Sequence, residues 1–244
     1  MADYNDRRTT TATSFGSVPR TGGQVVFDEG LRKHMLSIYN YMTSGVLLTG
    51  IVALLTFNSG LAYNFASGPL MWIVALSPLA IVFAMSFGAN RFSKTTLQMM
   101  FWAFAALMGL SMSTIFLRFT GGSIAVTFMA TAAAFAGLSL FGYTTKKSLS
   151  GFGTFLIMGV VGLLVAMIAN MFIQSAALMY GISFIGVLIF AGLTAYDTQR
   201  LKNEYAVLRG TEFAGKAIVL GALTLYLDFI NMFQFLLSFM GNRE

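Results

Sequence analysis

The sequence predicts an all-α membrane protein with seven transmembrane helices. Of its 244 residues, 57% are hydrophobic and only 10% are charged, whereas about 25% of residues are charged in a typical soluble domain. The apolar residues gather in seven runs, each near the ~20 residues that a helix needs to cross a ~30 Å hydrocarbon layer. The runs show almost no strict alternation of apolar and polar residues, so the short strands of a membrane β-barrel do not fit.

The chain divides into a polar N-terminal segment and a membrane domain. Residues 1–33 are rich in Thr, Ser, Gly and Arg and lack the apolar core of a signal peptide, so we expect a flexible cytosolic tail. Residues 34–244 are expected to form the membrane domain, in which charged or glycine-rich segments separate the apolar runs. In chain order, the predicted spans are 38–57, 69–87, 97–117, 123–142, 154–172, 178–196 and 217–239.

The basic residues predict the orientation of the spans. An odd number of crossings places the two termini on opposite sides, and thirteen of the fifteen Lys and Arg residues fall on the N-terminal side. Only Arg118 and Arg243 fall on the other side. The positive-inside rule therefore predicts a cytosolic N-terminus and an external C-terminus. The basic residues that raise the pI to about 9.7 are scattered over the connections between spans. We therefore interpret them as determinants of membrane topology and expect no nucleic-acid partner.

Two aspartates, Asp197 and Asp228, form the candidate site, because they are the only acids inside or at the edge of an apolar run. A carboxylate in hydrocarbon costs roughly 2.5 to 3.5 kcal/mol on insertion scales, so a chain that keeps two is expected to use them. Asp228 lies about eleven residues into the seventh span, or ~16 Å deep. Packing alone could also explain both acids, Asp228 bonded to Asn231 and Asp197 paired with Arg200 at the interface.

The residue types limit the chemistry of this site. The chain has no cysteine and one histidine, which excludes thiolate ligands and a zinc site built from two histidines. Metal chemistry would have to use oxygen ligands. We therefore expect no resident cofactor and name no catalytic residue.

Three motifs carry a resemblance to a known family. They are GLTAYDTQRLK at residues 192–202, GALTLYLDFIN at 221–231 and FGYTTKK at 141–147. On these motifs the chain, from about residue 30 to 244, resembles the bacterial branch of the Bax inhibitor-1 family, also called the transmembrane Bax inhibitor motif family.

The resemblance implies a fold and a function. The seventh helix would be central, and the protein would be a proton-sensitive calcium leak channel. Asp197 and Asp228 would be its pH sensor and weak calcium ligands, and Arg91, just after the second span, would pair with Asp197 as a latch. We expect Tyr196, Arg200 and Asn231 to support the acids.

The mechanism we expect follows from the cost of two neighbouring charges. Two carboxylates in a poorly solvated site cannot both ionise cheaply, so they should lose their protons in two coupled steps. A shared proton would hold the sixth and seventh spans together, and loss of this link or of the arginine link would favour opening. A sixth span that ends at residue 196 leaves Asp197 at the interface, nearly three turns from Asp228. If the sixth helix stays buried to Leu201 and the seventh enters the membrane near Leu220, the acids differ in height by about 6 Å.

Two other readings remain open. The chain could be a non-conducting regulatory protein that modulates a membrane protease or membrane homeostasis, with another membrane protein as its partner. It could also be an intramembrane aspartyl protease, although the second acid follows Leu225-Tyr226-Leu227 instead of a Gly-x-Gly sequence. We expect no enzyme, and we expect a multi-pass protein of the bacterial inner membrane whose partners are the lipid bilayer, calcium and protons.

Overall fold

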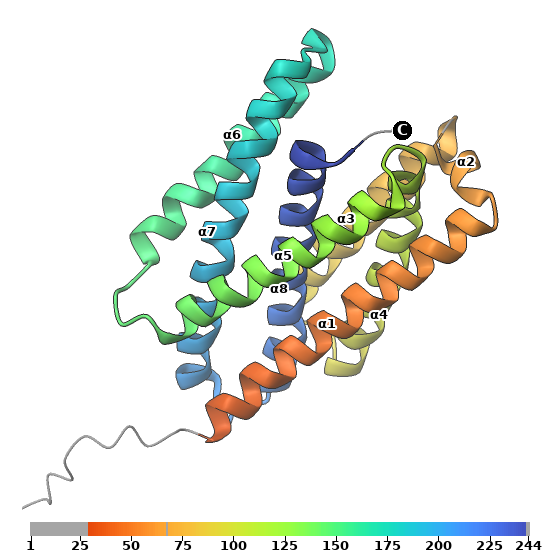
Figure 1. Cartoon of the computed structure of the whole chain (residues 1–244). Coiled ribbons are helices and arrows are strands. Elements are labelled where there is room, and N and C mark those ends of the chain that lie inside the picture. Colours follow the sequence, from red (N-terminus) through yellow and green to blue (C-terminus); the bar gives the residue numbers. More distant parts are fainter. Residues whose placement is uncertain (1–28, 67, 243–244) are drawn as a thin grey trace, which may run out of the picture.

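The described residues of the computed structural model, 29–66 and 68–242, form eight α-helices and one 3₁₀ helix (Figure 1). In chain order they are α1 (Glu29–Asn58), α2 (Leu61–Phe65), α3 (Pro69–Gly88), α4 (Lys94–Met112), η1 (Ser113–Leu117), α5 (Gly121–Thr144), α6 (Ser150–Ile173), α7 (Ala176–Leu208) and α8 (Ala214–Met240).

Seven of these helices are long and apolar enough to cross a membrane, which confirms the predicted number of spans among the described residues. The short helix α2 lies between the first two spans, and η1 continues the third span to Leu117. The all-helical fold class is therefore correct.

The start of α1 corrects one predicted boundary. The tail predicted over residues 1–33 lies outside the described residues up to residue 28, but residues 29–33 are helical. Glu29 lies in the first turn of α1, where a negative charge stabilises the helix by interacting with its dipole. The hydropathy of the sequence marked only the apolar part of this helix.

The end of α7 corrects a second boundary. The helix continues past Tyr196 to Leu208, and it stays buried as far as Leu201. Polar residues such as Gln199 and Lys202 end the apolar run, but they are compatible with helix, so the helix does not stop there. This extension places Asp197 well inside α7.

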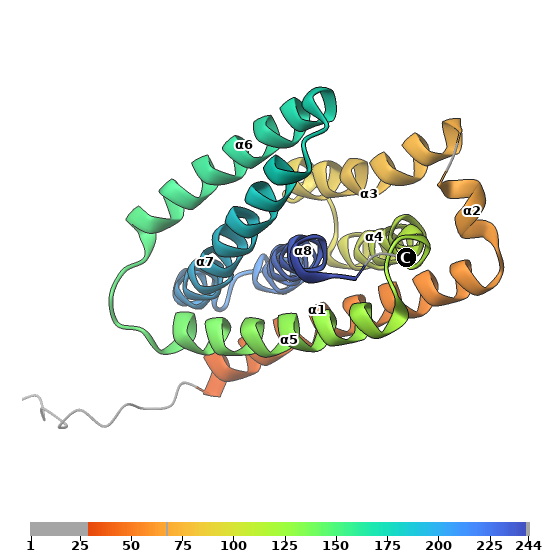
Figure 2. The same ribbon diagram turned by 45° about the horizontal axis from the view of Figure 1, so that its top comes forward.

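Helix α8 is the most buried span. In its most apolar 18-residue window 67% of the residues are buried, against 11–33% in the other six spans. It packs against α1, α4, α5 and α7, and Figure 2 shows these four helices around it. A polar side chain on α8 therefore meets protein on most sides, and not lipid.

A close approach of two backbones fixes α5 against α7. A Cβ atom built on Gly142 of α5 would lie only 2.2 Å from the carbonyl oxygen of Ala195 on α7. Any side chain here would force the two helices apart, because small residues are what let helix backbones approach closely in membranes. The contact lies two residues before Asp197 and helps to set its position.

A buried hydrogen-bond network joins α8 to α1 and α4. Thr49 Oγ1 donates to the carbonyl oxygen of Ala105 (2.8 Å), so the hydroxyl of Tyr226 is left to donate to Thr49 Oγ1 (2.6 Å). The side chain of Tyr226 is fully buried. The network therefore fixes α8 two residues before Asp228.

Replacing Tyr226 with phenylalanine is expected to lower the free energy of unfolding by about 0.5 to 1.5 kcal/mol, the usual contribution of one hydrogen bond. The midpoint of thermal unfolding in detergent measures this change. Tyr180→Phe is the matched control, since Tyr180 is 48% exposed on α7. Equal effects of the two changes would mean that the network does not stabilise the bundle.

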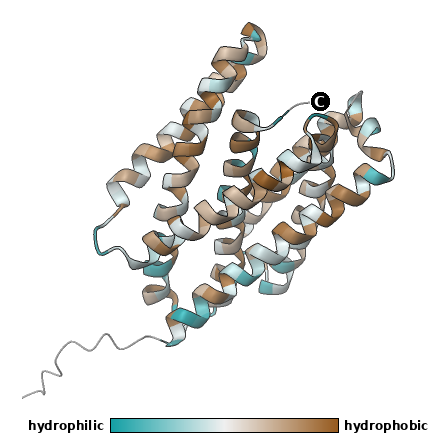
Figure 3. Ribbon diagram, in the orientation of Figure 1, coloured by the Kyte–Doolittle hydropathy of each residue, from teal (hydrophilic) through white to brown (hydrophobic). Residues whose placement is uncertain are grey.

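One end of the bundle gathers the basic residues. Lys216, in the first turn of α8, donates to the carbonyl oxygens of Ala89 (3.4 Å) and Asn90 (3.5 Å) after α3, and His34 of α1 contacts the ring of Tyr205 on α7. Figure 3 shows hydrophilic residues near the start of α1 and the neighbouring helix ends, with hydrophobic residues along the helices. We call this the basic end. It consists of the start of α1, the α3–α4 turn, the α5–α6 connection and the α7–α8 connection.

Candidate functional site

The two aspartates come from the two most closely associated helices. Asp197 of α7 is 5% exposed and Asp228 of α8 is 4% exposed. Measured along the helices from the basic end, Asp197 lies ~16 Å from Leu208 and Asp228 lies ~21 Å from Ala214. The long α7 thus brings the acids to similar heights, which the boundaries predicted from the sequence did not.

The carboxyl groups of Asp197 and Asp228 are neighbours across the contact of α7 with α8. An ionised carboxylate only accepts hydrogen bonds, so a bond between the two acids requires that one of them carries a proton. Asp228 Oδ2 is buried and has no hydrogen-bond partner among the described residues. The site thus places a buried carboxyl oxygen without a partner beside a second acid.

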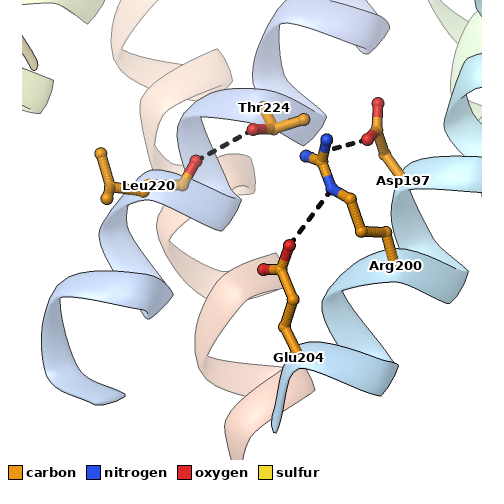
Figure 4. Close-up of polar contacts among 5 residues, drawn as sticks. All are labelled: Asp197, Arg200, Glu204, Leu220 and Thr224. Atoms are coloured by element: carbon orange, nitrogen blue, oxygen red, sulfur yellow. Dashed lines mark hydrogen bonds and ion pairs between the residues drawn. The ribbon is translucent and has the colours of Figure 1, made fainter. Parts of the chain in front are cut away.

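Arg200 is the cation at this site. Its Nη2 lies 2.9 Å from Asp197 Oδ1, and its Nε lies 3.5 Å from Glu204 Oε1 (Figure 4). The two groups are close enough for an ion pair, but their geometry is not that of a hydrogen bond, since Asp197 Oδ1 has no hydrogen-bond partner among the described residues. The Arg200 side chain is 37% exposed, and Asp197 is buried. The guanidinium group therefore links the buried acid to the basic end.

The expected ion pair between Arg91 and Asp197 is not formed among the described residues. Arg91 is exposed in the turn after α3, where its backbone N–H donates to the carbonyl oxygen of Gly88 (2.9 Å). Arg200 takes that place instead. It lies one turn from Asp197 on the same helix, so the pairing needs no contact between helices.

The other expected supporting residues lie near the acids but serve their own helices. The ring of Tyr196 lies 5.9 Å from the guanidinium carbon of Arg200. Asn231 donates to the carbonyl oxygen of Leu227 (2.8 Å), one turn back on α8, and no contact with Asp228 is recorded in the described chain. Asn231 is therefore not the packing partner that the sequence suggested for Asp228.

Sequence reasoning missed Gln199, which joins α7 to the α5–α6 connection. Its side-chain oxygen accepts from the backbone N–H of Leu149, and its amide nitrogen donates to the carbonyl oxygen of Lys147, both at 2.8 Å. The side chain is buried. The sequence offered no signal for it, because only the structure shows that this polar side chain is buried and so needs partners.

The donor set at the site limits its affinity for cations. Within residues 29–66 and 68–242, no group of three or more His, Cys, Asp or Glu residues could hold a metal ion. Two carboxylates supply at most four oxygens, whereas calcium prefers six to eight. Arg200 also neutralises one of them.

Comparison with known proteins identifies the family. A family model described as "Inhibitor of apoptosis-promoting Bax1" matches residues 31–244, nearly all of the chain. The chain belongs to the Bax inhibitor-1 family. The resemblance seen in the motifs around Asp197 and Asp228 is thus confirmed.

Bacterial relatives in this Bax inhibitor-1 family match the chain over most of its length. An uncharacterised protein of Caulobacter vibrioides is 45% identical over 93% of this chain and 96% of its own length. An uncharacterised protein of Rickettsia prowazekii is 40% identical over the full length of both. The inner membrane protein YbhL of Escherichia coli is 43% identical over 93% of this chain and 98% of its own length. This relative is an inner membrane protein, and the present chain has seven helices that could cross a membrane. Together these findings confirm the predicted location, a multi-pass protein of the bacterial inner membrane.

Proposed function

We propose that this protein is a pH-sensitive calcium leak channel of the inner membrane, with α8 as its central helix and its N-terminus in the cytosol. The observation that carries the proposal is the meeting of two buried carboxyl groups, from α7 and α8, with one arginine. Ionisable residues inside a membrane protein usually mark an ion or proton pathway. In this proposal the described arrangement is the closed state, because the guanidinium group of Arg200 is paired with Asp197 and leaves no room for a cation there.

The charge of the pair decides whether the closed state is stable. With one shared proton the pair has a charge of −1, which Arg200 balances, and the two acids remain bonded. With two protons Asp197 is neutral and the attraction of Arg200 is lost. With no proton the two carboxylates repel each other in a poorly solvated site. Flux should therefore be lowest where the pair holds one proton and should rise on either side.

Calcium would be the permeating ion and not a resident one. Once Arg200 moves away, the two carboxylates offer a negatively charged site with too few oxygens for tight binding, and water or backbone carbonyls must complete the shell. Weak binding suits conduction, because an ion must leave as readily as it enters.

The two rival readings differ in what they require of the acids. An aspartyl protease also shares a proton between two carboxyl groups, but one of them must be free to activate water, whereas here Arg200 pairs with Asp197. A regulatory protein without conduction would need neither flux nor a titratable pair. These differences make flux the deciding measurement.

Calcium flux into liposomes that contain the purified protein, measured over a pH series, tests the proposal. The parent should show a minimum. Asp228→Asn keeps a hydrogen-bond donor beside Asp197 but cannot become charged, so flux should no longer rise at high pH. Asp197→Asn loses the arginine link and should leak at every pH.

Glu212→Gln is the matched control for these variants, since Glu212 is an exposed acid in the α7–α8 connection. It should keep the minimum of the parent. Absence of flux from the pure parent, together with a stoichiometric membrane-protein partner on purification, would replace the channel by the regulatory reading. The same pH profile in all four proteins would remove the sensor role of the acids.

A further inference from the structure

A groove opens between α1 and α5, and neither acid of the pair lines it. Its volume is about 680 Å³, and its lining is almost entirely apolar. Side chains of α1 and α5 form its two walls, and Phe229 of α8 also lines it. Since α1 and α5 both cross the membrane and pack on α8, the groove faces the bilayer.

The length of the groove matches one leaflet of the bilayer. It extends from Arg32 to Leu47 on α1 and from Phe128 to Tyr143 on α5, which is ~22 Å along each helix. Half of a bilayer, with its headgroup region, measures about 20 to 22 Å. Arg32 and Tyr143 both lie at the basic end, so the groove covers the leaflet on that side only.

The headgroup end of the groove is positive. Arg32 lines it and is exposed. Lys202 of α7 donates to the carbonyl oxygen of Tyr143 (2.6 Å), and its Nζ lies 5.4 Å from the Tyr143 ring. Two cations thus flank the entrance, while the rest of the lining offers hydrocarbon contact. Basic pockets between transmembrane helices at the cytoplasmic side favour anionic headgroups.

The groove also reaches the neighbours of both acids. Ser139, which lines it, accepts a hydrogen bond from Thr198 (3.4 Å), the residue after Asp197. Phe229, the residue after Asp228, packs edge to face on Phe128 and Phe135 of α5. A molecule that fills the groove would therefore press on α7 and α8 at the level of the site.

We propose that the groove between α1 and α5 binds one anionic phospholipid from the leaflet at the basic end, with an acyl chain against Phe135 and Phe229 and the headgroup phosphate at Arg32 and Lys202. An effect of this lipid on calcium flux rests on the proposed function, whereas its binding does not.

Native mass spectrometry of the full chain, mixed with equal amounts of phosphatidylglycerol and phosphatidylcholine, tests the proposal. The parent should retain one phosphatidylglycerol in preference to phosphatidylcholine. Ala136→Trp, which fills the groove, should lose this bound lipid. Arg32→Gln should lower the preference for the anionic lipid about five-fold, the effect of one basic residue near a membrane surface.

Two matched controls use exposed neighbours that do not line the groove. Ala134→Trp adds the same bulk to the opposite face of α5, and Lys33→Gln removes the adjacent charge. Both should bind lipid as the parent does. No preference for the anionic lipid in the parent, or equal loss in the control variants, would overturn the proposal, as would a dimer whose second copy fills the groove.

A fluorescence measurement covers the case in which Ala136→Trp does not fold. The chain has no cysteine, so a bimane probe can be attached at Ala136→Cys or at Ala134→Cys alone. Brominated phosphatidylglycerol should quench the probe at position 136 more strongly than the probe at position 134. Equal quenching would contradict a bound lipid.

Discussion

Replacing Arg200 with glutamine is expected to raise calcium flux on the order of ten-fold in the pH range where the parent is most closed. The change leaves Asp197 buried without its cation. Breaking a fully buried ion pair costs about 3 to 5 kcal/mol, whereas a surface pair contributes about 0 to 1 kcal/mol. Because Arg200 is 37% exposed, we expect about 1 to 2 kcal/mol, and 1.4 kcal/mol shifts an equilibrium roughly ten-fold.

The matched variant for this prediction is Arg91→Gln. Arg91 lies on an exposed turn at the same end of the bundle and contacts its own turn. Its replacement should leave the flux and its pH minimum unchanged in the liposome assay. If Arg91→Gln raises the flux and Arg200→Gln does not, the latch would be the arginine that the family resemblance suggested.

Replacing Gly142 with alanine should strongly destabilise the bundle, although it adds only one methyl group. The new methyl would lie 2.2 Å from the carbonyl oxygen of Ala195, and a backbone atom cannot rotate away. Overpacking of this kind costs about 1 to 3 kcal/mol, and we expect the upper end of that range. Thermal unfolding in detergent measures the loss, and the displacement of α7 should also raise calcium flux.

Gly137 supplies the control on the same helix. A Cβ atom there meets nothing within 4 Å, so Gly137→Ala should keep or slightly raise stability through the better helix propensity of alanine. A similar loss of stability in both variants would show that the crossing of α5 and α7 is not the reason for Gly142.

The spans could be predicted from sequence, because twenty consecutive apolar residues have one stable form in a membrane. The end of α7 could not. Hydropathy measures the preference for lipid, and the segment after Tyr196 is polar yet helical, with Gln199 bonded to the α5–α6 connection. The depth of Asp197 follows from that packing and not from the composition of its neighbours.

The acids of the candidate site could also be found from sequence, since a carboxyl group in an apolar run is costly enough to stand out. For the arginine that pairs with Asp197, the sequence offered both Arg200, three residues on, and Arg91, from the family resemblance, and could not decide between them. Several basic residues lie at the same end of the spans, and topology explains each of them equally well. Only coordinates distinguish Arg200, 2.9 Å from Asp197, from Arg91, which is exposed.

The distance between α7 and the rest of the bundle gives the most direct test of whether the acidic pair holds the protein closed. Since the native chain has no cysteine, spin labels can be placed at Val207 on α7 and Met99 on α4, both exposed. In the parent, electron–electron resonance should give one short distance where the pair holds a single proton and a longer one after full deprotonation, while Asp228→Asn should keep the short distance at high pH. Identical distances at every pH in the parent, or the same lengthening in Asp228→Asn, would contradict control of the helices by these acids.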